Sequence, residues 1–110
     1  SLLWDETMDA RVRVDWDRGT TFTPPARWYH QHFNLGDEPA RYFAMHGSPL
    51  GGLEASRTFD ATDPSNQIEY HEEDPAIRAY FRAELDERGV AWNMPEDCYR
   101  DPDFAFGTAP

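Results

Sequence analysis

The chain has 110 residues, which is enough for one small domain built around one hydrophobic core. Its formal charge is −11, and all ten of its basic residues are arginines. This balance lacks the basic patch that binding to nucleic acid or to an anionic membrane requires, so neither partner is expected. Aromatic residues make up 15% of the chain, which favours a packed domain over a disordered one.

Cys98 is the only cysteine, so an internal disulfide and a cysteine-based zinc knuckle are both excluded. No basic residue or histidine lies next to it in the sequence to lower its pKa, and we expect an inert thiol. A single unpaired cysteine is typical of a reducing compartment. With no apolar run of membrane-spanning length and no signal-peptide pattern, the sequence predicts a cytoplasmic protein.

A series of short strands is predicted in the first part of the chain. The clearest is 10–16, where Val12, Val14 and Trp16 alternate with charged residues in the period of a half-buried strand. Brief turns and no helical pattern separate the strands, which favours an antiparallel sheet or barrel over a parallel α/β fold. The predicted strands cover residues 1–4, 10–16, 19–23, 28–34 and 40–45.

The second part of the chain begins with a stretch, 46–66, that is rich in Gly, Ser, Pro, Thr and Asp and is predicted to be a flexible loop. A short strand is predicted at 67–70. The sequence therefore divides into a β-region over 1–70 and a C-terminal region over 71–110 that holds one helix and an extended tail.

The C-terminal helix is predicted over 75–88. Asp74 and the proline after it form an N-cap with proline at the first helical position. Gly89 suits the left-handed position that ends a helix, and Val90 would then contact Leu85 as in a Schellman ending. An apolar stripe at helical spacing predicts packing of this helix against the sheet; it consists of Ile77, Tyr80, Phe81 and Leu85.

The stretch 19–34 contains the candidate functional residues. Alternation along the predicted strand 28–34 places Trp28, His30, His32 and Asn34 on one face. The two imidazoles are then about 6.5 Å apart along the strand. Histidine is a common ligand of transition metals, so this face is a candidate metal site.

The same stretch resembles the second conserved motif of the cupin superfamily, which is written G-(x)5-P-x-G-(x)2-H-(x)3-N. Gly19, Pro25, His30 and Asn34 fall at the motif's spacings, and Arg27 stands where the motif has its second glycine. The resemblance implies that His30 is a metal ligand. It also implies an all-β fold, part of an antiparallel cupin-type double-stranded β-helix, or jelly-roll barrel, with one C-terminal α-helix.

Cupins carry their other ligands, an H-x-H pair and a glutamate, in a first motif upstream. No histidine occurs in 1–18, and Gly36 and Asp37 stand where that glutamate would follow if His30 and His32 formed the first motif. The resemblance therefore implies the C-terminal portion of a longer bacterial cupin-domain protein. We expect this portion alone to be oligomeric or poorly folded, because it leaves unpaired strand edges.

The resemblance implies that the intact protein binds a divalent transition metal, Fe, Mn or Zn, which this portion alone would not retain. His30 is the expected ligand and His32 a candidate second ligand, and the expected pocket residues are Trp28, Asn34, Phe22 and Tyr42. The expected partners are a small organic molecule and further copies of the chain. Three functions stay open: a metal-dependent enzyme resembling a dioxygenase, a non-catalytic binding or regulatory cupin, and a structural domain with a vestigial site.

Overall fold

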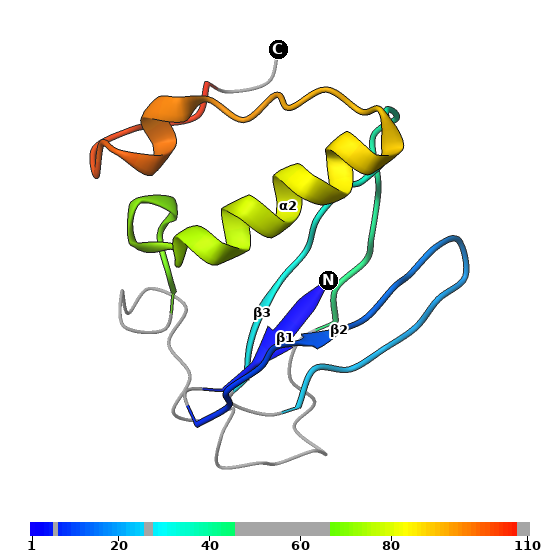
Figure 1. Cartoon of the computed structure of the whole chain (residues 1–110). Coiled ribbons are helices and arrows are strands. Elements are labelled where there is room, and N and C mark those ends of the chain that lie inside the picture. The colour runs from blue at the N-terminus through cyan, green and yellow to red at the C-terminus, as the bar shows by residue number, and fades with distance from the viewer. Residues whose placement is uncertain (6, 26–27, 46–66, 108–110) are drawn as a thin grey trace. The chain divides into compact units, whose positions relative to one another are not determined.

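The computed structural model describes residues 1–5, 7–25, 28–45 and 67–107. These residues form two compact units, which are described separately here and are coloured by residue number in Figure 1. The first unit holds the described residues of Ser1–Asn34 together with 43–45, and the second holds Leu35–Tyr42 together with 67–107. Within these ranges, no helix has both the length and the apolar character needed to cross a membrane.

The first unit is built on a three-stranded antiparallel sheet (Figure 1). The central strand is β1, Leu2–Trp4, with β2, Val12–Arg13, on one side and β3, Tyr29–Gln31, on the other. Leu2 and Leu3 of β1 are only 7% and 4% exposed, so the central strand supplies the buried apolar side chains of this unit. These two residues point to opposite faces, so the central strand is buried on both sides, whereas Val12 and His30 beside Leu3 are exposed.

The strand register decides which side chains share a face. Leu3 lies opposite Val12 on one neighbour and His30 on the other, so these three residues belong to the same face. The opposite face carries Trp4, whose ring stacks on Tyr29 with centroids 5.9 Å apart. The predicted alternation of faces in both outer segments therefore agrees with the register, although each strand is shorter than expected.

The main element of the second unit is the helix α2, Pro75–Arg88, whose predicted bounds are confirmed. The carboxylate of Asp74 accepts a hydrogen bond from the backbone N–H of Ala76 at 2.9 Å, which satisfies one donor at the start of the helix. Gly89 has φ +67°, and the N–H of Val90 donates to the Leu85 carbonyl at 3.0 Å. These features are the predicted Schellman ending.

Aromatic packing holds the second unit together. Two short 3₁₀-helices flank α2: η2, Tyr70–Glu72, and η3, Glu96–Tyr99. The Tyr99 ring lies 5.6 Å from Tyr70 and 6.1 Å from Trp92, measured between ring centroids. Arginines of α2 lie over this cluster, with the Arg82 guanidinium 4.3 Å from the Trp92 centroid. The buried residues of the unit are Ile77, Leu85, Cys98 and Tyr99.

The predicted all-β jelly-roll barrel is wrong for the described residues, which form an open sheet and a helix. Two of the strands predicted before residue 46 are missing. Residues 19–23 form no strand, and the prolines at 24 and 25 that follow them lack the N–H groups that a sheet ladder needs. Residues 40–45 are exposed throughout, including Phe43 at 86%, so no buried face stabilises a strand there.

Two further predictions for the middle of the chain have different outcomes. The predicted strand at 67–70 is absent, and Tyr70 instead begins η2, in which the N–H of Glu73 donates to the Tyr70 carbonyl at 3.3 Å. The predicted flexible loop at 46–66 lies outside the described residues.

Candidate metal centre

The two histidines of the candidate site lie side by side at the end of β3. Their ring centroids are 5.3 Å apart and their planes are inclined by 52°. His30 is exposed and His32 is half-buried. The alternation of side chains along an extended segment accounts for this pairing, because residues two apart point to the same face.

The ring separation fits two ligands on one ion. A zinc–nitrogen bond of about 2.1 Å and tetrahedral geometry place the ring centroids of two imidazoles on a single ion about 5 Å apart. The measured separation of His30 and His32 is 5.3 Å. Within the described ranges, however, no cluster brings together three or more His, Cys, Asp or Glu side chains suited to a metal ion. Two imidazoles fall short of a complete site, since three or four protein ligands are usual.

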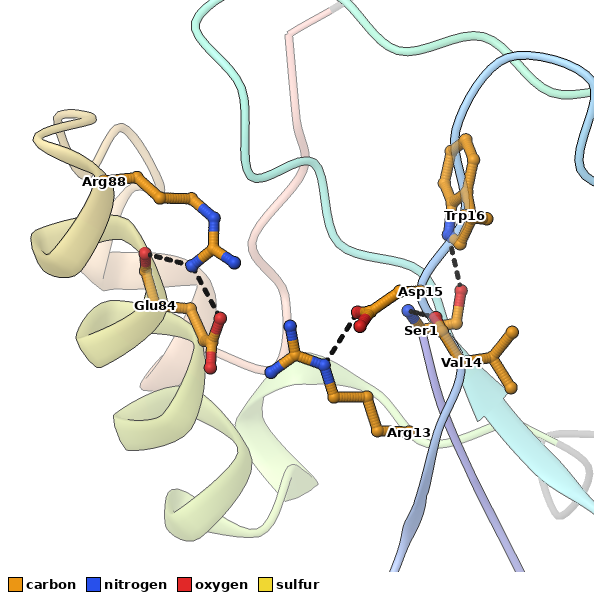
Figure 2. Close-up of polar contacts among 7 residues, drawn as sticks. All are labelled: Ser1, Arg13, Val14, Asp15, Trp16, Glu84 and Arg88. Carbon is orange, nitrogen blue, oxygen red and sulfur yellow. Dashed lines mark hydrogen bonds and ion pairs between the residues drawn. The ribbon is translucent and has the colours of Figure 1, made fainter.

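Ser1 connects the His32 imidazole to the neighbouring strand segment. The Ser1 hydroxyl lies 2.7 Å from Nδ1 of His32 and accepts a hydrogen bond from the indole Nε1 of Trp16 at 2.9 Å. The Ser1 backbone is paired with Val14. Its nitrogen donates to the Val14 carbonyl at 2.8 Å (Figure 2), and its carbonyl accepts from the Val14 N–H at 2.9 Å. The position of the hydroxyl beside His32 is thus fixed by the ladder.

Aromatic rings surround His32 on two sides. The Phe22 ring meets the imidazole edge to face at 6.0 Å between centroids, and the Trp16 ring does so at 6.3 Å. Burial lowers the pKa of His32 below its ordinary value of 6.5, and the charge of the neighbouring His30 lowers it further. His32 is therefore neutral at pH 7, which is the form that binds a metal ion.

The expected pocket residues are only partly assembled around the histidines. Phe22 contacts His32, as described above. Trp28 is half-buried just before β3, and its N–H donates to the Pro25 carbonyl at 3.2 Å. Asn34 is exposed at the end of the first unit. Tyr42 belongs to the second unit, and 64% of it is exposed.

Ser1 and Trp16 are the site residues that the sequence prediction missed as partners of His32. The register of the three strands contains the information that places them beside His32. Leu2 lies opposite both Arg13 and Gln31, so one step back along the ladder sets Ser1 between Val14 and His32. Such a signal becomes usable only when the strand pairing is known, because a lone serine at the start of a strand predicts nothing by itself.

Comparison with protein-family models, curated proteins and solved structures found no match to this chain.

Proposed function

We propose that this chain contributes a two-histidine half-site, formed by His30 and His32, for a divalent transition metal such as iron, manganese or zinc. The remaining ligands come from a second copy of the chain. In the cytoplasm, the completed site binds or transforms a small organic molecule. When bound, the ion supplies a Lewis acid with coordination positions open to that molecule.

The observation that carries this proposal is the 5.3 Å separation of the two imidazole centroids. The neutral state of His32 also supports it, because an imidazolium has no lone pair to donate. Exposure of His30 leaves the pair open to further ligands from solvent, a substrate or a partner. The cupin-like spacing around His30 supports the same assignment independently of the geometry, as a resemblance at the level of sequence.

A structural role is the competing hypothesis. The contact between Ser1 and His32 joins the end of β3 to the start of β1, and such a contact stabilises a small sheet without any ligand. The two hypotheses differ in one measurable respect. Replacement of a structural imidazole by an amide of similar shape should leave metal binding unchanged. Replacement of a ligand should weaken metal binding.

Zinc titration by isothermal calorimetry tests the proposal with matched histidine variants. His30→Gln and His32→Gln each remove one imidazole of the pair, and His71→Gln removes an exposed imidazole in η2 of the second unit. We expect the unaltered chain to bind zinc reversibly and to lose it on dialysis, because two ligands hold an ion weakly. Both pair variants should weaken binding at least tenfold, and His71→Gln should leave it unchanged.

Elemental analysis of the dialysed chain completes the test. Less than one equivalent of any transition metal should remain. Binding that is absent in the unaltered chain, or that falls equally in His71→Gln and in the pair variants, would refute the half-site. Stoichiometric metal after dialysis would show that the chain supplies a complete site.

A further inference from the structure

We draw no further inference here: the strongest candidate, the exposed apolar segment 43–45 of the first unit, in which Phe43 and Met45 are 86% and 84% exposed, carries none because nothing in the structure shows what covers it.

Discussion

Replacement of Gly89 by alanine should destabilise the second unit through backbone strain alone. Gly89 ends α2 with φ +67°, a left-handed conformation that costs an L-residue about 1–2 kcal/mol. A Cβ built at this position meets no atom within 4 Å, so steric overlap adds nothing. Alanine also restricts the unfolded chain, which returns about 0.4–1 kcal/mol. The net loss is about 1 kcal/mol of unfolding free energy, or a fall of roughly 4–8 °C in the midpoint.

Gly107 provides the matched control for this substitution. An added Cβ at Gly107 likewise meets no atom within 4 Å, but its φ lies outside the left-handed range. Gly107→Ala should therefore leave the midpoint unchanged or raise it slightly. Helical circular dichroism followed during thermal unfolding measures both variants. Equal midpoints for the two would refute the assignment of the cost to the left-handed conformation.

Three other predictions concern the helix cap, Arg82 and the pKa of His32. Asp74→Ala removes the bond to the Ala76 N–H and should cost about 1 kcal/mol by urea denaturation, whereas Asp74→Asn should keep most of the stability. Arg82→Met removes both the contact with Trp92 and the ion pair with Glu96, and should lower the free energy of unfolding by about 1 kcal/mol at this partly exposed site. A larger loss of stability in high salt than in low salt would contradict an electrostatic origin. The pKa of His32 is lower in the folded chain than its ordinary value of 6.5. As the pH falls through 6.5, the unfolded chain therefore takes up more protons than the folded chain, and the free energy of unfolding should decrease. His32→Gln should flatten that pH dependence, and an unchanged slope would contradict it.

The helix could be predicted from the sequence because its signals are local. Asp74 and Pro75 mark its start, and Gly89 marks its end, within one turn of the residues they affect. The hydrogen bond from Val90 to Leu85 also follows from local geometry once Gly89 is left-handed. None of these features depends on where the rest of the chain lies.

The barrel could not be predicted correctly because closure is a non-local property. Alternation in 10–16 requires one buried and one exposed face, and an open sheet satisfies that as well as a barrel does. The segment 40–45 shows the same limit, because Tyr42 and Phe43 have strand propensity but are exposed. Propensity becomes a strand only where a partner strand and a covering layer are present.

The candidate site could be predicted from the sequence only in part. The pairing of His30 with His32 could be predicted because it depends only on their two-residue spacing along an extended segment. The hydroxyl that faces His32 could not, since it comes from Ser1, thirty-one positions away in the sequence. That contact exists because β1 is the central strand, with β2 and β3 on either side, and its first residue reaches both neighbours. Local spacing thus pairs the two imidazoles, and the register of the sheet determines which hydroxyl faces His32.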